Sequence, residues 1–301
     1  MAKRSGITIV RGGIIAALLA LPMAASDAQD RSARGHAAGQ RSTTNQNREN
    51  HSLFPTSTAR QRKETLNALP MARLTPQARR RILSIAESPT FYRRLPTQAI
   101  SCDRDMFLFL TRNPDVLVGI WDLLGITNVE IERKGPYQLQ AVDGSGTSCT
   151  VDLVYGDPNL HVFVADGRYD GKMTAKPIEG KGVFILRSQY AIDADGGTTV
   201  TGKLDCFVHF DGIGVDLVVR TLSGLIGRSA DNNFIETARF ISQISQSAES
   251  NPPAMIDVAQ RLPQVQPATK VQFVDVITTV AKRQAATPRT ANRPLFVPTK
   301  H

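Results

Sequence analysis

The sequence predicts an α+β fold, a curved antiparallel sheet of about six to seven strands packed on a long C-terminal helix. Between residues 127 and 222, apolar and polar residues alternate with a period of two, as they do in strands. Short turn-like segments, such as Asp143-Gly144 and Gly196-Gly197, separate these strands, and connections this short join antiparallel neighbours. Residues 231–245 then change to a helical period with one apolar stripe, which must be buried against the sheet.

Residues 75–88 predict a short amphipathic helix ahead of the sheet. Thr75 is suited to cap its N-terminus, Pro76 fits the first turn because its missing N–H has no partner there, and Pro89 marks the end. Residues 97–102 are predicted as the first strand, and residues 103–113 as a helix.

A second helix is predicted between Asn113 and Gly125. Asn113 and Pro114 are typical of a helix start, and Gly125 is typical of a helix end. The apolar residues recur at i, i+3, i+4 and i+7, and Trp121 lies on that apolar face. Trp121 is interpreted as a core anchor, and in the alternative as a contact for a ligand.

Seven strands are predicted after these helices. In one of them Val200, Leu204 and Cys206 share a face, whereas Lys203 and Asp205 share the other, which indicates a sheet with one solvated face. The predicted ranges are 128–134, 137–142, 149–155, 160–165, 183–192, 199–210 and 215–221.

The helix of residues 231–245, with Asp231 or Ser229 as its cap, carries its apolar residues on one face. These residues are Phe234, Ala238, Ile241, Ile244 and Ala248. Residues 254–262 are predicted as a further short helix, and residues 271–283 fit either a helix or a strand.

The two ends of the chain differ from this patterned region. Residues 1–28 combine a basic start with an apolar stretch, which predicts a signal peptide and an exported, periplasmic or extracellular protein. Residues 29–62 are polar and basic and are predicted as a disordered linker. Residues 63–265 form one predicted α+β domain with its core at 96–251, and residues 266–301 form a partly disordered C-terminal segment. No transmembrane span is expected after signal cleavage.

The formal net charge of +9 is unevenly distributed. Residues 101–280 carry a net charge of −7, whereas the arms at both ends are basic. An acidic body repels phosphate backbones, so nucleic acid is not expected as a partner. The basic arms are suited to an anionic envelope surface instead.

His161 and His209 are the two histidines within the predicted fold. Either one, with an aspartate such as Asp166 or Asp211, is a candidate for hydrolase chemistry. Strand alternation indicates that the two histidines face different sides, and neither HExxH nor GxSxG is present. No catalytic residue, metal site or cofactor is therefore predicted.

Cys102, Cys149 and Cys206 fall at inward-facing strand positions. One disulfide with one free thiol is one interpretation in an oxidising compartment, with the pairing unknown. The alternative is three buried thiols without a bond.

Arg187 shares strand parity with the apolar residues Val183 and Ile185. One interpretation is that it meets the anionic head group of a ligand inside a cavity. The alternative is that it pairs with an acidic neighbour such as Asp205. The residues predicted to contact a ligand are Arg187, Trp121, Phe234 and Ile241.

The order of these elements resembles the helix-grip fold of the START-like superfamily, in which a curved sheet grips a C-terminal helix. The resemblance covers residues 96–251 and rests on element order together with WDLLG, VFILRSQYAI, GKLDCFVHF and DNNFIETARFISQIS. It implies that lipids or other hydrophobic molecules are held between sheet and helix, and in some members it implies cyclase activity. No functional residue is carried over, because no family motif matches residue by residue.

The function predicted from the sequence is non-enzymatic binding of a hydrophobic or amphiphilic, lipid-like molecule by an exported domain. One alternative is an enzyme, a hydrolase or cyclase that uses His161 or His209 with an aspartate. Another is an envelope-associated interaction protein tethered by its basic arms. The space between the sheet and the helix of residues 231–245 distinguishes them. An apolar void favours ligand binding, a void with converging His and Asp favours the enzyme, and a packed space favours the interaction protein.

Overall fold

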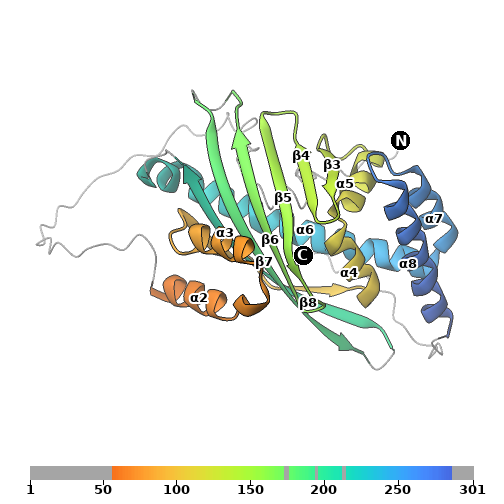
Figure 1. Cartoon of the computed structure of the whole chain (residues 1–301). Coiled ribbons are helices and arrows are strands. Elements are labelled where there is room, and N and C mark those ends of the chain that lie inside the picture. The colour runs from red at the N-terminus through yellow and green to blue at the C-terminus, as the bar shows by residue number, and fades with distance from the viewer. Residues whose placement is uncertain (1–55, 173–175, 194–195, 212–214, 287–301) are drawn as a thin grey trace, which may run out of the picture.

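The computed structural model describes residues 56–172, 176–193, 196–211 and 215–286, with only the backbone described at 56–58 and 215–229. The predicted signal peptide, residues 1–28, lies outside these ranges, as does most of the predicted linker. Within them the chain has the predicted α+β architecture, in which a long helix lies across a curved antiparallel sheet (Figure 1).

Eight antiparallel strands form one sheet in the order β1-β8-β7-β6-β5-β4-β3, and β2 pairs with β8 further along that strand. Strands β3 to β8 are neighbours in chain order, as their short connections require. The bounds are β1 Phe91–Arg94, β2 Gln98–Ser101, β3 Glu130–Gly135, β4 Gln138–Val142, β5 Thr147–Gly156, β6 Leu160–Tyr169, β7 Ile178–Ile192 and β8 Thr198–Asp211.

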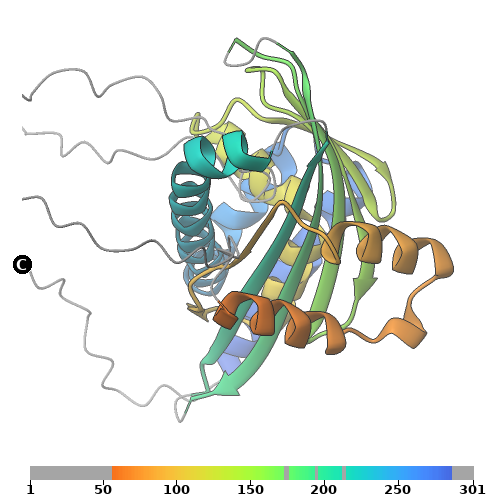
Figure 2. The same cartoon turned by 90° about the vertical axis from the view of Figure 1, so that its left-hand side faces the viewer.

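Helices lie against both faces of the sheet (Figure 2). The concave face packs against α4 (Arg104–Arg112), α5 (Pro114–Leu123) and α6 (Val215–Ser250). α7 (Pro252–Arg261) and α8 (Pro267–Ala286) pack on α4 and α6 at one end of the molecule. The convex face carries α2 (Thr56–Asn67), the 3₁₀ helix η1 (Met71–Arg73) and α3 (Pro76–Ala86).

Helix capping in the structure agrees with the prediction at Thr75 and differs from the prediction at Asn113. The Thr75 hydroxyl accepts a hydrogen bond from the Ala78 N–H at 3.2 Å, as predicted for the start of α3. The Asn113 side chain does not cap α5, because its Oδ1 accepts a hydrogen bond from Arg133, while its amide donates to the Phe109 carbonyl at the end of α4. With only one residue between the two helices, that side chain serves the end of the first helix.

Strand alternation produces two hydrophobic cores, one on each face of the sheet. On β8, Leu204 and Cys206 belong to the concave core, whereas Phe207 belongs to the convex core. The prediction of a solvated outer face is therefore wrong over this part of the sheet. Apolar residues of α3, such as Ile82 and Ile85, cover it, and the buried charge of Asp205 is neutralised there by arginines.

The predicted boundaries need two corrections. α2 begins at Thr56, inside the predicted linker of residues 29–62, and it packs on β1. α8 lies beyond the predicted domain end at residue 265, yet Phe273, Ile277 and Val280 are buried in the concave core. In α8 these side chains recur at i, i+4 and i+7, so the helical alternative for residues 271–283 is the observed one.

The predicted strand at residues 215–221 is wrong, because α6 begins at Val215. Its β-branched residues fit a strand locally, but Val218, Leu222 and Leu225 have the i, i+4, i+7 spacing of a helix. Neither Ser229 nor Asp231 therefore caps this helix. Asp231 lies within it and pairs with Arg93 of β1.

Candidate ligand-binding cavity

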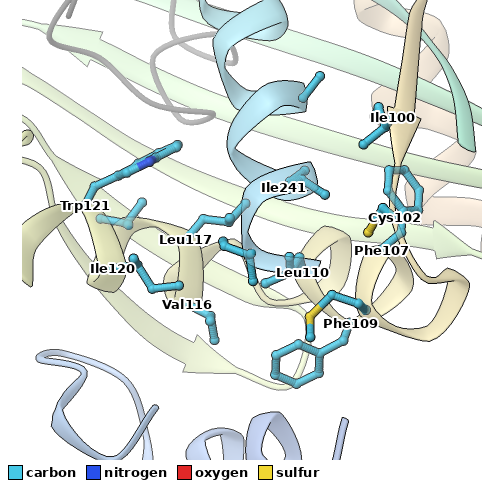
Figure 3. Packing of buried hydrophobic residues seen from close by; sticks show 14 of the residues in the cluster. Ile100, Cys102, Phe107, Phe109, Leu110, Val116, Leu117, Ile120, Trp121 and Ile241 are labelled. Atoms are coloured by element: carbon cyan, nitrogen blue, oxygen red, sulfur yellow. The ribbon is translucent and has the colours of Figure 1, made fainter. Parts of the chain in front are cut away.

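A cavity of about 80 Å³ lies between α6, α4 and the concave face of the sheet. Its described lining residues come from segments far apart in the sequence, which are β2, α4, the start of α5, the strands β4 to β8 and α6. Figure 3 shows Ile100 of β2, Phe107 and Leu110 of α4 and Ile241 of α6 around this region. The cavity thus occupies the space between sheet and helix where the sequence predicted one.

The walls are almost entirely apolar. The helices contribute Phe107, Leu110 and Pro114 from α4 and α5, and Phe234, Ala238 and Ile241 from α6. The strands contribute Leu139, Ala141, Val151, Phe163, Leu186 and Leu204. Among the described lining residues the two with polar side chains are Thr111 and Thr237, and none is charged.

Hydrogen bonds hold α6 in place over the cavity. The Ser242 hydroxyl donates to the Ser101 carbonyl at 2.8 Å, and the Asp103 N–H donates to the Ser245 hydroxyl at 2.9 Å. These bonds attach α6 to the end of β2 and to the start of α4. Small residues such as Ala238 then leave space between the helix and the sheet, which larger side chains at the same positions would fill.

Two of the four predicted ligand contacts line the cavity, and two do not. Phe234 and Ile241 are part of its wall. Trp121 is buried, and its ring packs on Phe240 with 5.6 Å between ring centroids. It is not among the lining residues, so its position agrees with the core anchor. Arg187 lies on the opposite, convex face of the sheet.

Arg187 takes part in a buried ionic network centred on Asp205, the partner named in the alternative interpretation. Its guanidinium donates to the fully buried Asp205 carboxylate at 2.7 Å, and Arg94 donates to the same carboxylate at 2.8 Å. The Tyr92 hydroxyl donates to it at 2.7 Å, and burial together with this bond raises the pKa of Tyr92 to about 12. Arg187 also donates to the Thr65 carbonyl of α2 at 3.0 Å, so the network attaches α2 to the sheet.

The lining residues that the sequence analysis missed come from α4 and from the central strands. Phe107, Leu110 and Thr111 lie at i, i+3 and i+4 on one face of α4, and that spacing was a usable signal. Phe163 is an alternating strand residue, and alternation identifies a face without showing which face lies under α6.

His161 and His209 lie on opposite faces of the sheet, as strand alternation indicated. His161 is fully buried on the concave side, where its Nε2 accepts a hydrogen bond from Arg112 at 3.2 Å and its Nδ1 has no partner. Burial, reinforced by the Arg112 charge, lowers the pKa of His161 to about 4. On the convex side the His209 Nδ1 lies 3.0 Å from the Ser88 carbonyl, and its Nε2 lies 3.5 Å from Asp211.

Cys102, Cys149 and Cys206 are all buried and unbonded, which agrees with the interpretation of three packed thiols. Burial raises the pKa of both Cys102 and Cys149 to about 12, and it raises the pKa of Cys206 further. Thiols with these pKa values are protonated at neutral pH and do not act as nucleophiles.

In the part of the chain that the structure describes, no three His, Cys, Asp or Glu side chains come together in an arrangement that would hold a metal ion. Across the same residues, no helix combines the length and the apolar character that crossing a bilayer requires.

No protein-family model matches the chain, and no curated protein matches it. Among solved structures, dicamba monooxygenase bound to dicamba is 12% identical over 67% of this chain and 62% of that chain, with a TM-score of 0.35. Ara h 8.0201 is 12% identical over 47% of this chain and 97% of that chain, with a TM-score of 0.28. An uncharacterised protein from Rhizobium leguminosarum is 12% identical over 48% of this chain and 94% of that chain, with a TM-score of 0.30. At these identities and TM-scores, the similarities assign neither a family nor an activity to this chain.

Proposed function

We propose that the chain binds a small hydrophobic molecule in the cavity between α6, α4 and the concave face of the sheet. The observation that carries this proposal is the apolar wall, in which Phe107, Leu186 and Ile241 from three different elements converge on one space. A concave apolar space with few polar groups is typical of a site for a hydrophobic ligand.

The volume of the cavity bears on the size of the ligand. An apolar cavity of about 150 Å³ in another protein stays dry and binds benzene. The cavity here, about 80 Å³, is of the same order. It therefore suits a small ring or a short hydrocarbon chain, and a lipid-sized molecule would require α6 or α4 to move.

The histidines favour binding over the alternative of a hydrolase or cyclase. Neither His161 nor His209 lines the cavity. The Nε2 lone pair that His161 would use as a base already accepts the Arg112 hydrogen bond. His209 is on the opposite face of the sheet, so a molecule in the cavity is out of its reach.

The location of the protein is part of the same proposal. The signal-like residues 1–28 and the basic arms favour an exported protein that carries its ligand outside the cytoplasm, with the arms near an anionic envelope surface. Cell fractionation with N-terminal sequencing tests this part, and retention of residues 1–28 on a cytoplasmic protein would contradict it.

Toluene binding followed by titration calorimetry tests the cavity. We expect Ala238→Leu, which adds bulk inside the lining, to weaken binding at least about tenfold, equivalent to ~1.4 kcal/mol. The control is Gln243→Leu, the same new side chain on the exposed face of α6. Equal binding by both variants would show that toluene occupies another place.

A further inference from the structure

Two polar side chains on the concave face of the sheet are buried without satisfying all of their hydrogen-bonding atoms. His161 of β6 and Ser188 of β7 are 0% and 1% exposed. Among the residues that the structure describes, neither the His161 Nδ1 nor the Ser188 Oγ has a hydrogen-bond partner. A buried polar atom without a partner carries an unfavourable free energy, because it has lost its hydrogen bonds to water. Each of these two atoms therefore needs a partner.

The strand register places the two side chains next to each other. His161 is opposite Leu186 in the pairing of β6 with β7, and Ser188 lies two residues beyond Leu186. Because residues two apart on a strand face the same way, His161 and Ser188 are diagonal neighbours on one face of the sheet. The Cα atoms of diagonal neighbours are about 7–8 Å apart, which suits a single water molecule that bridges their side chains.

The His161 ring is turned so that its Nδ1 faces β7, the strand of Ser188. On the other side of His161, Gly156 of β5 is its partner in the register. A Cβ atom built on Gly156 would lie 3.3 Å from the His161 Cδ2 and 3.7 Å from its Nε2, so this edge of the ring faces β5. The Nδ1 is on the opposite edge of the ring, and β7 is the other neighbour of β6 in the sheet.

The position of the proton on His161 follows from its contact with Arg112. A guanidinium group only donates, so the His161 Nε2, which lies 3.2 Å from the Arg112 Nε, is the unprotonated nitrogen. Burial lowers the pKa of His161 to about 4, so at neutral pH the ring is uncharged and carries its proton on Nδ1. The Nδ1 is thus a donor, and the Ser188 hydroxyl is able to accept. A water molecule between them would satisfy both groups.

Tyr190 supplies a third polar atom beside these two. It lies two residues beyond Ser188 on the same face, and its ring packs on Phe107 of α4 with 6.2 Å between ring centroids. Burial raises the pKa of Tyr190, and both Arg112 and the Ser188 hydroxyl oppose this rise, which shows that they lie close to it. The Tyr190 hydroxyl donates its own proton to the Pro158 carbonyl at 2.6 Å, so its oxygen remains an acceptor.

We propose that His161, Ser188 and Tyr190 hold one internal water molecule, which accepts a hydrogen bond from the His161 Nδ1 and donates to the Ser188 Oγ and the Tyr190 oxygen. Three hydrogen bonds are typical of a buried water. The water connects β7 to α4, because His161 is bound to Arg112 in the last turn of α4. Arg112 follows Thr111 of the cavity wall, so the site stabilises that part of the wall. The three residues that hold the water are not among the described lining residues, so the site is separate from the cavity and does not depend on the proposed function.

High-resolution crystal structures of the full chain test the site, with bromide in place of chloride in the crystallisation solution. The variant is Ser188→Ala, which removes one partner of the water. Ser245→Ala is the matched control, because Ser245 is also fully buried, but its hydroxyl already has protein partners in the Asp103 N–H and the Glu249 carboxylate. Histidine ¹⁵N NMR of the unsubstituted protein gives the tautomer of His161 without any substitution.

We expect electron density for one water within about 3.2 Å of both the His161 Nδ1 and the Ser188 Oγ. This density should be present in the unsubstituted protein and in Ser245→Ala, and it should be lost from Ser188→Ala. The NMR spectrum should place the proton of His161 on Nδ1. A direct bond between His161 and Ser188, a bromide ion at the site, a water that is retained in Ser188→Ala, or a proton on Nε2 would each overturn the proposal.

Discussion

The two faces of the sheet use the same strands for different purposes. On β8, Leu204 faces a cavity under α6, whereas its neighbour Asp205 is buried on the convex face and bound by Arg94, Arg187 and Tyr92. The concave face combines apolar side chains with unfilled space. The convex face combines apolar packing with a charge network.

Because side chains alternate between the two faces of a sheet, neighbouring residues of one strand can have different roles. The convex network joins α2, β1, β7 and β8 through Asp205 and requires an exact set of partners. Substitutions in the convex network should therefore change stability, and substitutions in the cavity wall should change binding.

The largest effect is expected for Asp205→Ala. Removing this carboxylate leaves two arginines and a tyrosine hydroxyl without their partner, and loss of one member of a buried ionic network costs about 3–5 kcal/mol. Urea unfolding measures the change in free energy. The control is Asp166→Ala, whose carboxylate is half exposed and pairs with Arg81.

A second measurement sharpens the comparison between the two faces. It is the toluene affinity of Asp205→Ala at a urea concentration well below the midpoint of unfolding, where the variant is folded. We expect it to be unchanged, because Asp205 faces away from the cavity. A stability loss below ~1 kcal/mol would show that the network contributes little, as is the rule for exposed pairs.

A smaller effect is expected on the concave side from the titration of His161. Its pKa in the folded protein, about 4, is below the ordinary value near 6.5, so the unfolded chain binds the proton more tightly. Stability is therefore complete above pH 6.5 and falls as the pH decreases towards 4, by roughly 3 kcal/mol in total. Urea unfolding between pH 7 and 4 measures this loss.

His161→Leu should flatten that part of the pH profile, since the variant has no proton to gain at this position. His209→Leu is the matched control on the convex face and should retain the decrease. If the profiles of the original protein and His161→Leu coincide, burial of His161 is not the cause of the pH dependence.

The smallest effect is expected for Arg187→Met, which retains an aliphatic side chain and removes one of the partners of Asp205. We expect a loss of about 1–2 kcal/mol, because Arg94 and Tyr92 remain bound to the carboxylate. The toluene affinity should be unchanged. A clear loss of binding with unchanged stability would restore the sequence-based hypothesis that Arg187 contacts the ligand.

The class of fold and part of the cavity could be predicted from the sequence. Alternation in β8 placed Leu204 and Cys206 on one face, and the helical stripe identified Phe234 and Ile241, both of which line the cavity. These signals are local, because the hydrophobic periods of two in strands and 3.6 in helices can be recognised from residues close together in the sequence.

The sequence could not predict which set of alternating strand residues lies under α6, because alternation does not reveal which side of a sheet a distant helix covers. Arg187 does share a face with Val183 and Ile185, as predicted, but that face is the convex one under α3. The positions of Thr111 and Thr237 in the cavity wall likewise depend on two helices that only tertiary packing brings together.

The central claim, that the concave face holds the ligand and the convex face does not, is tested most directly by methyl NMR during titration with toluene. The account predicts chemical-shift changes at the cavity methyls of Leu110, Leu186 and Ile241, and none at the convex methyls of Ile82 and Val183. Unchanged cavity methyls at saturating toluene, or larger shifts on the convex face, would contradict it.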